Sequence, residues 1–244
     1  MGIVIAVASG KGGTGKTSVT GGVAAALAMA GQRVLCIDMD IGLRNLDISL
    51  GLSDRALMDF ADVALGRCTL SRAAVRHPDL KELSLLTAPM SLPPSLSTYR
   101  VRSMLSAART LYDYILIDAP AGLGPGFQYA VCGADRALVV ATNDASSLRD
   151  AQRVVAELDW LPQVHLVMNR IQPKLLRKLR TTIDDAMNTA GLPLIGVIPE
   201  DAQVMLCANR GIPLTSQGRK GAAMACRNIA WRLMGRRVPI MRIR

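Results

Sequence analysis

Short apolar runs alternate along this chain with longer segments that mix apolar and polar residues. Runs of this kind, bounded by polar and turn-forming residues, are typical of buried strands. Because helical segments separate them, they favour a parallel sheet with helices on both faces. We therefore predict a doubly wound, mostly parallel α/β fold. The expected strands cover residues 3–9, 33–38, 83–88, 112–118, 136–142, 164–170 and 193–199.

Two helices are marked clearly by their residues. The first is expected to begin near Lys16 and to end at Gly31, since glycine commonly ends a helix. The second covers residues 218–235 and has one apolar face. No repeat or linker divides the chain, so we expect one domain over residues 1–235 and a short tail over 236–244. The expected apolar face of the second helix consists of Ala222, Cys226, Ile229, Ala230 and Leu233.

Polar residues follow the expected strands at their carboxyl ends. In a doubly wound sheet, ligands bind beyond these ends. We therefore expect the functional site along this edge of the sheet. The residues that mark it are Gly10–Thr17, Asp38, Asp40, Asp118, Asn169, Arg170, Pro199, Glu200 and Asp201.

The stretch SGKGGTGKTS carries the main candidate chemistry. Residues 10–17 satisfy the phosphate-binding pattern G-x-x-x-x-G-K-[ST], between an expected strand and an expected helix, as the pattern requires. Backbone amides from Gly12 onward could curl around phosphates at the helix N-terminus. Lys16 would then reach the β- and γ-phosphates, and the Thr17 hydroxyl would bind Mg²⁺. The stretch predicts a P-loop nucleotide-binding protein.

Three carboxylates stand at or just beyond strand ends. Asp118 ends an apolar strand, where P-loop proteins place the acid of the Mg²⁺ shell. Asp38 ends the adjacent strand and Asp40 follows it, so on extended backbone their side chains would point the same way. One would touch the metal shell and the other would orient the attacking water. The alternative is that one of them only caps a neighbouring helix.

Lys11 is a second lysine in the loop, at a position for which the phosphate-binding pattern asks for no cation. Folding it onto its own phosphates would crowd Lys16. A cation near a transferred phosphoryl group can be supplied by another molecule, so Lys11 could reach the nucleotide of a facing subunit. The alternative is an ordinary solvated loop lysine.

Composition narrows the function classes. The net charge of +10 favours anionic partners such as nucleotides, nucleic acid or acidic lipid. The five cysteines have no metal-site spacing, and their odd number suits a reducing cytoplasm. We expect no signal peptide and no membrane-spanning helix, because the first residues lack a basic leader and no apolar run reaches about 18 residues.

The loop GKGGTGKTS resembles the deviant Walker A loop, K-G-G-x-G-K-[TS], of the MinD/ParA family of ATPases. Further runs resemble the family in the same order, and IGLRNLD is especially similar to its MinD branch. The resemblance covers roughly residues 1–240. These further runs are IDMDIGLRNLD, DAPAG, SSLRD and GVIPED, beginning at residues 37, 118, 146 and 196.

The resemblance implies a role for individual residues. Lys11 would cross a dimer interface to the partner's phosphates, while Lys16 acts on its own nucleotide. Asp40 would position the hydrolytic water, and Asn45 and Asp150 would lie near the dimer interface. The implied ligands of Mg²⁺ are Thr17, Asp38 and Asp118. The implied nucleotide-binding residues are Gly12, Gly13, Thr14, Gly15, Lys16, Thr17, Ser18, Asn169, Arg170, Pro199, Glu200 and Asp201.

The resemblance also implies a function and its partners. It implies an ATP- and Mg²⁺-dependent dimerising switch with slow hydrolysis that places the division site at the membrane, together with a division inhibitor and an ATPase activator. The expected location is the cytoplasm, with peripheral attachment at the inner face of the cell membrane. One alternative is a ParA-type positioner that binds DNA non-specifically, which the charge favours. The same scaffold could also serve an ATP-dependent synthetase, or a nucleotide-bound scaffold protein that does not hydrolyse.

The tail departs from the family pattern, in which a basic amphipathic helix ends the chain and enters the bilayer surface. Here Pro239 discourages a continuous helix. Each cation near an anionic leaflet contributes about 1 kcal/mol, so the tail could be a weak anchor that dimerisation doubles. The alternative is a solvated or packed extended segment. The candidate lipid contacts are Arg236, Arg237, Arg242 and Arg244.

Overall fold

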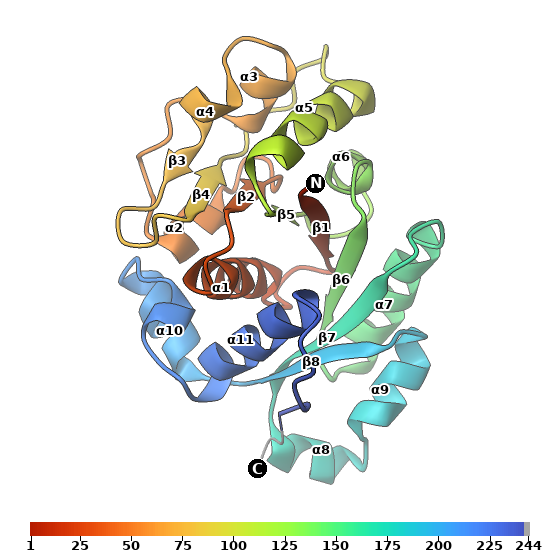
Figure 1. The fold of residues 1–244 in the computed structure, drawn as a ribbon. Coiled ribbons are helices and arrows are strands. Elements are labelled where there is room, and N and C mark those ends of the chain that lie inside the picture. The colour runs from red at the N-terminus through yellow and green to blue at the C-terminus, as the bar shows by residue number, and fades with distance from the viewer. Residues whose placement is uncertain (242–244) are drawn as a thin grey trace.

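The computed structural model describes residues 1–241 and contains one eight-stranded sheet (Figure 1). The strand order is β3-β4-β2-β5-β1-β6-β7-β8, and every pairing except β3 with β4 is parallel. The predicted doubly wound, mostly parallel fold is therefore confirmed. The strands are β1 (Ile3–Ala8), β2 (Val34–Asp38), β3 (Val75–Arg76), β4 (Leu83–Leu86), β5 (Tyr114–Asp118), β6 (Arg136–Ala141), β7 (Val164–Ile171) and β8 (Leu194–Pro199).

Helices cover both faces of the sheet. One face packs against α3, α4, α5, α6, α7 and α9, and the other packs against α1, α2, α10 and α11. The helices are α1 (Lys16–Met29), α2 (Asn45–Leu50), α3 (Phe60–Ala64), α4 (Leu70–Ala73), α5 (Thr98–Leu111), α6 (Pro125–Val131), α7 (Ala145–Glu157), α8 (Pro173–Leu179), α9 (Ile183–Ala190), α10 (Ala202–Asn209) and α11 (Gly221–Leu233), with a 3₁₀ turn at Leu214–Ser216.

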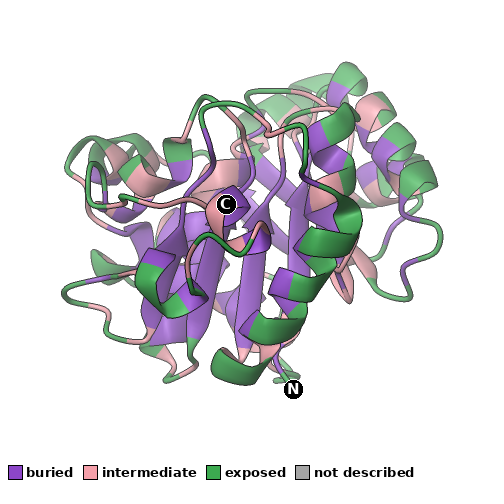
Figure 2. Ribbon diagram, turned by 90° about the horizontal axis from the view of Figure 1, so that it is seen from above, coloured by how far each residue is buried: buried purple, intermediate pink, exposed green. Residues whose placement is uncertain are grey.

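The central strand β1 shows why the strands are apolar throughout. Val4, Ala6 and Ala8 pack into the core on one face, whereas Ile5 and Val7 pack into the core on the other. Because successive side chains of a strand point to opposite faces, a strand covered on both sides has no position left for a polar residue. Figure 2 shows the strands of the sheet coloured as buried along most of their length.

All seven expected strands are present, and the sheet has one strand that the apolar pattern does not predict. This strand, β3, has only two residues, and neither is buried. It pairs antiparallel at the edge of the sheet. The first helix ends at Met29, and Gly31 adopts φ 84°, the left-handed conformation expected of a helix-ending glycine.

The last helix, α11, packs against α1 with the predicted face, and all five of its expected residues are buried. The approach is close at Gly22, where an added Cβ would lie 2.8 Å from the Cys226 sulfur. The helix begins at Gly221, later than the predicted residue 218.

Residues 236–241 form no helix and run back along the molecule. The Arg232 guanidinium holds them by donating hydrogen bonds to the carbonyls of Val238 at 3.0 Å and Pro239 at 2.5 Å. The described part of the tail is therefore a non-helical and mostly exposed segment that Arg232 holds against the molecule. The candidate lipid contacts Arg242 and Arg244 lie outside the described residues, and the boundary between residues 235 and 236 stays a prediction. Within residues 1–241, no helix has the length and apolar character needed to cross a membrane.

Candidate functional site

The glycine-rich loop joins β1 to α1 at the carboxyl edge of the sheet. Gly13 and Gly15 adopt φ 80° and 83°, in the left-handed region that favours glycine. Gly15 is also the N-cap of α1, and an added Cβ there would lie 2.3 Å from the Asn169 amide nitrogen. Glycine at this position is therefore required both by backbone conformation and by space.

The loop surrounds a cavity of about 410 Å³, which we call the phosphate cradle. Helix α1 begins in it, so its N-terminal amides point toward an anion placed there. Asp40 and Asn45 also line the cradle. The predicted phosphate-binding residues that line the cradle are Gly12, Gly13, Thr14, Gly15, Lys16, Thr17 and Ser18.

Asp118 organises the inner end of the cradle. It is fully buried and accepts hydrogen bonds from Lys16 Nζ at 2.9 Å and from the Thr17 hydroxyl at 2.7 Å. The Thr20 hydroxyl, one turn along α1, donates to the same carboxylate at 3.0 Å. Thr20 was not predicted as a site residue. Its position could have indicated this role, because Thr20 follows Thr17 by three residues and residues three apart share a face of a helix.

These groups fit Mg²⁺ and a nucleotide phosphate. The Thr17 hydroxyl and the Asp118 carboxylate are oxygen ligands of the kind that Mg²⁺ prefers, and they stand together beside Lys16. The buried Thr14 hydroxyl in the cradle has no hydrogen-bond partner, and a phosphate oxygen could supply one. Within residues 1–241, no group of three or more His, Cys, Asp or Glu side chains is placed to hold a metal ion. Mg²⁺ would therefore take further oxygen ligands from the phosphates or from water.

Asp38 lies behind the cradle and contacts backbone. It is 1% exposed, and its carboxylate accepts hydrogen bonds from the amides of Asp40 at 2.9 Å and Leu46 at 3.1 Å. Burial, helped by the charge of Asp118, raises the pKa of Asp38 to about 7. In this structure Asp38 therefore holds the start of α2, as the capping alternative proposes, and its role as a Mg²⁺ ligand stays a prediction.

Asp40 occupies a different position from Asp38. It is half-buried and lines the cradle, whereas Asp38 does not. Because β2 ends at Asp38, strand alternation does not fix the direction of Asp40 relative to Asp38, and the expectation that the two side chains point the same way stays a prediction. Burial raises the pKa of Asp40 above its usual value.

A second cavity, of about 480 Å³, adjoins the cradle at Gly15 and Ser18, and we call it the base pocket. Its apolar walls, which include Val204, Met205 and Leu214, suit a flat aromatic ring. The predicted base-side residues are all here: Asn169, Arg170, Pro199, Glu200 and Asp201.

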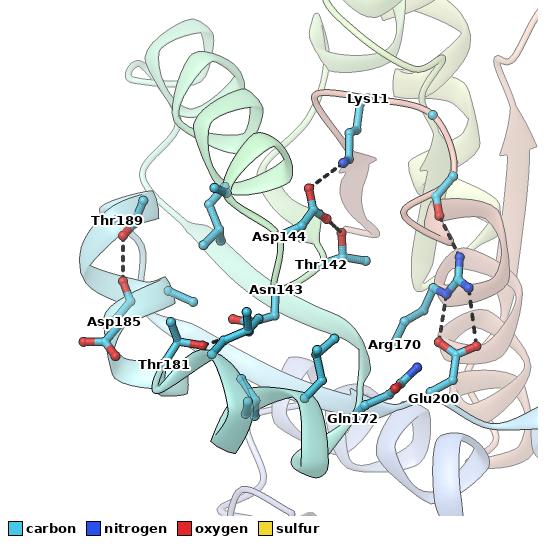
Figure 3. Close-up of a pocket in the computed structure, with 18 residues that line it drawn as sticks. Lys11, Thr142, Asn143, Asp144, Arg170, Gln172, Thr181, Asp185, Thr189 and Glu200 are labelled. Atoms are coloured by element: carbon cyan, nitrogen blue, oxygen red, sulfur yellow. Dashed lines mark hydrogen bonds and ion pairs between the residues drawn. The ribbon is translucent and has the colours of Figure 1, made fainter.

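Two residues of the base pocket also hold the loop. The Asn169 amide donates to the Thr14 carbonyl at 2.8 Å. The Arg170 guanidinium donates to the Gly13 carbonyl at 3.3 Å and to the Glu200 carboxylate at 2.8 Å (Figure 3). The end of β7 therefore sets the position of the phosphate cradle as well as the wall of the base pocket.

Lys11 does not turn toward Lys16. Its ammonium group donates to the Asp144 carboxylate at 2.7 Å (Figure 3). It also donates to the Ser146 hydroxyl at 2.9 Å, on the same chain. Partial burial raises the pKa of Asp144, but hydrogen bonds from Lys11, Thr142, Ser146 and Ser147 outweigh it and hold that pKa below the usual range. Asp144 and Ser146 were not predicted as site residues.

The remaining interface candidates flank the loop. Asn45 is exposed at the first position of α2. Asp150 lies on α7 beside the start of the loop, where a Cβ added to Gly10 would lie 2.3 Å from the Asp150 carbonyl oxygen. The structure brings both residues to the rim of the site, and their place in a dimer interface stays a prediction.

Known proteins share this architecture. Residues 5–214 match the family described as the CobQ/CobB/MinD/ParA nucleotide binding domain. The chain is 40% identical to the septum site-determining protein MinD of Helicobacter pylori, over 98% of this chain and 92% of that protein. The structure titled MinC:MinD cell division protein complex, from Aquifex aeolicus, has a TM-score of 0.91 and 37% identity and covers 98% of each chain.

A further solved structure, MinD complexed with Mg-ADP from Pyrococcus horikoshii, has a TM-score of 0.83 and 28% identity, over 96% of each chain. The family match covers most of the chain, and the similarity to MinD of Helicobacter pylori covers 98% of it. The resemblance drawn from the motifs is thus confirmed. The chain belongs to the CobQ/CobB/MinD/ParA family of nucleotide-binding proteins and is a MinD-like ATPase within it.

Proposed function

We propose that this chain is an ATP-dependent dimerising switch that acts in septum placement. The observation that carries the proposal is the separation of the two loop lysines. Lys16 contacts Asp118 inside the cradle, whereas Lys11 extends along the rim to Asp144. A cation on the rim is available to the nucleotide of a facing subunit, where added charge matters most as the transition state forms.

The residues of the site divide the work of ATP hydrolysis. The loop amides and Lys16 hold the β- and γ-phosphates, and Asn169 with Arg170 keeps the loop in place beside the base pocket. Thr17 and Asp118 would hold Mg²⁺, which neutralises charge on the phosphates when it is bound. Asp40, which lines the cradle, orients the attacking water.

Dimerisation couples this chemistry to a signal. Lys11 from each subunit completes the site of the other, so hydrolysis requires the dimer. Hydrolysis then removes the ATP that holds the two subunits together, and the dimer dissociates. Asn45 and Asp150 lie on the rim that would face the partner. Because the site is incomplete in one subunit, hydrolysis by the isolated chain is expected to be slow.

We propose partners by similarity to the MinD proteins. One of the most similar structures is a complex of MinC with MinD, which supports a division inhibitor of that kind as a partner. A separate activator of hydrolysis and attachment to the inner face of the cell membrane complete the proposal. Arg236 and Arg237 are the described cations of the tail that could contact lipid. Non-specific DNA binding, which the charge of +10 favours, is the alternative.

Sedimentation velocity of the native chain with ATP, ADP or no nucleotide, in the presence of Mg²⁺, tests the switch. The proposal predicts dimers with ATP and monomers otherwise. Equal sedimentation in all three states would contradict it. In the source cell, loss of the chain is expected to misplace septa while DNA partition continues, whereas a partition defect with normal septa would favour the DNA alternative.

A further inference from the structure

Helix α8 presents a row of cations without acidic partners. The residues that follow Pro173 read KLLRKLR, and in the described part of the chain none of their cations forms an ion pair. Like charges three and four positions apart on a helix repel one another. An anionic partner would relieve this repulsion. The exposed cations are Lys174, Arg177, Lys178 and Arg180.

Exposed leucines lie among these cations. Leu175 and Leu179, one turn apart, are 45% and 51% exposed. They line a cavity of about 700 Å³ between α7, α8 and α9 together with Leu176, which is less exposed and packs against the core. Leucines that project with lysine and arginine suit the interface of a lipid leaflet, which accepts apolar side chains. DNA phosphates would gain nothing from them, so the pattern favours lipid over nucleic acid.

The tail lies against the same helix. Ile240 and Met241 line a cavity of about 480 Å³ together with Pro173 and Leu176 of α8. Figure 1 shows the last described residues of the chain near α8, although the two segments are far apart in sequence. Ile240 is 41% exposed, so its apolar surface extends that of the leucines. The tail therefore adds apolar surface beside the cations of α8, and Asp184 of α9 is an acidic residue that also lines this cavity.

We propose that α8 and the adjoining tail residues Ile240 and Met241 form a surface that binds an anionic lipid leaflet. This proposal rests on the membrane contact proposed above. It assigns most of that contact to α8 and less of it to the tail. A cation near an anionic leaflet contributes about 1 kcal/mol, which is about fivefold in binding. Because each subunit carries one such surface, dimerisation presents two and strengthens attachment.

Co-sedimentation of the full chain with phosphatidylglycerol–phosphatidylcholine vesicles tests this surface. The double variant Lys174→Gln/Lys178→Gln is expected to bind at least about tenfold more weakly than the native chain. The double variant Leu175→Ser/Leu179→Ser is expected to bind several-fold more weakly at unchanged charge. The matched control, Arg72→Gln/Arg100→Gln, removes two exposed and unpaired cations from α4 and α5 and is expected to bind normally.

Each variant is also tested for ATP-dependent dimerisation and for binding to duplex DNA. Native-like dimers with weak vesicle binding by both α8 variants would support the proposal. Full vesicle binding by either α8 variant, or no vesicle binding by the native chain, would overturn it. Loss of DNA binding with vesicle binding intact would also overturn it, in favour of nucleic acid.

A failed switch would show separately, because the native chain would then form no ATP-dependent dimer. Vesicle binding by the native chain and by the α8 variants would then still be compared, at low salt and without nucleotide. The vesicle result for α8 thus stands apart from the result for the proposed function.

Discussion

Lys11 is held on its own chain by Asp144, and this contact competes with any contact to a partner. We expect Asp144→Asn to strengthen ATP-dependent dimerisation by up to about fivefold, since an exposed ion pair contributes about 0.2–1 kcal/mol. Asparagine still accepts the hydrogen bond from the Ser147 amide as the N-cap of α7, so the helix is retained. Sedimentation velocity over a range of protein concentrations with ATP and Mg²⁺ measures the change.

A matched control for this variant is Asp113→Asn, which breaks the exposed ion pair between Asp113 and Arg33. It is expected to leave dimerisation unchanged. Dimerisation of Asp144→Asn that equals or falls below that of the native chain would mean that the Lys11–Asp144 contact does not oppose assembly.

Asp38 is expected to make stability depend on pH. Its pKa, raised to about 7 by burial and by the charge of Asp118, exceeds the value of about 3.9 in an unfolded chain. Between these values the folded chain binds more protons, so the free energy of unfolding should fall by a few kcal/mol as pH rises from about 4 to 7. Urea unfolding without nucleotide, in the presence of a chelator, measures this slope.

The variant Asp38→Asn isolates the effect, because it removes the titrating group. Asparagine resembles the protonated carboxyl group that Asp38 carries at acid pH, so the variant should be close to the native chain there and its stability should vary less over the same pH range. Parallel pH profiles for the two chains would show that Asp38 is not the group responsible.

At the scale of elements, the loop and α7 pack in contact at Gly10. A Cβ added there would lie 2.3 Å from the backbone oxygen of Asp150, a rigid neighbour. We expect Gly10→Ala to reduce the free energy of unfolding by about 1–3 kcal/mol. Gly12→Ala is the control, because nothing lies within 4 Å of an added Cβ and no left-handed φ is required there. Equal stability of the two variants would show that α7 moves away freely.

The strands could be predicted from the sequence because each is buried on both faces and therefore forms a continuous apolar run. The edge strand β3 could not, since two residues that pair at an edge leave no periodic pattern. The backbone contacts of Asp38, which keep it out of the cradle wall, were also out of reach. They depend on β2 ending at Asp38, and the boundaries of elements are the least certain part of a pattern.

The residues of the site also differ in how far the sequence alone could predict them. The phosphate cradle was predictable because its residues are contiguous and their spacing has a direct physical meaning. Asp144 and Ser146 were not, because only the folded sheet brings the loop after β6 beside Lys11. Thr20 lies between these cases, since it shares a helix with Thr17 but meets Asp118 only in the fold.

At the scale of the whole molecule, nucleotide binding should stabilise the fold. With ATP and Mg²⁺ at about 100 times the dissociation constant, stability rises by about 2.7 kcal/mol, which is roughly 5–10 °C in Tm for a chain of this size. Lys16→Gln should show a much smaller shift relative to its own baseline, because its cradle lacks the cation. Differential scanning calorimetry measures both, and an equal shift in the variant would place the nucleotide elsewhere.

In the proposed dimer, Lys11 contacts the nucleotide bound to the other subunit, whereas Asp40 orients the water that attacks the nucleotide of its own subunit. Two inactive variants, Lys11→Ala and Asp40→Ala, test this arrangement when they are mixed. In the mixed dimer, the site of the Lys11→Ala subunit keeps its own Asp40 and receives Lys11 from its partner.

The measurement is ATP hydrolysis by each variant alone and by the mixture. Mixing is expected to restore activity, up to about a quarter of the native rate, because about half of the dimers are mixed and each has one intact site. A mixture as inactive as its separate components would contradict the account and would return Lys11 to its own nucleotide or to a structural role.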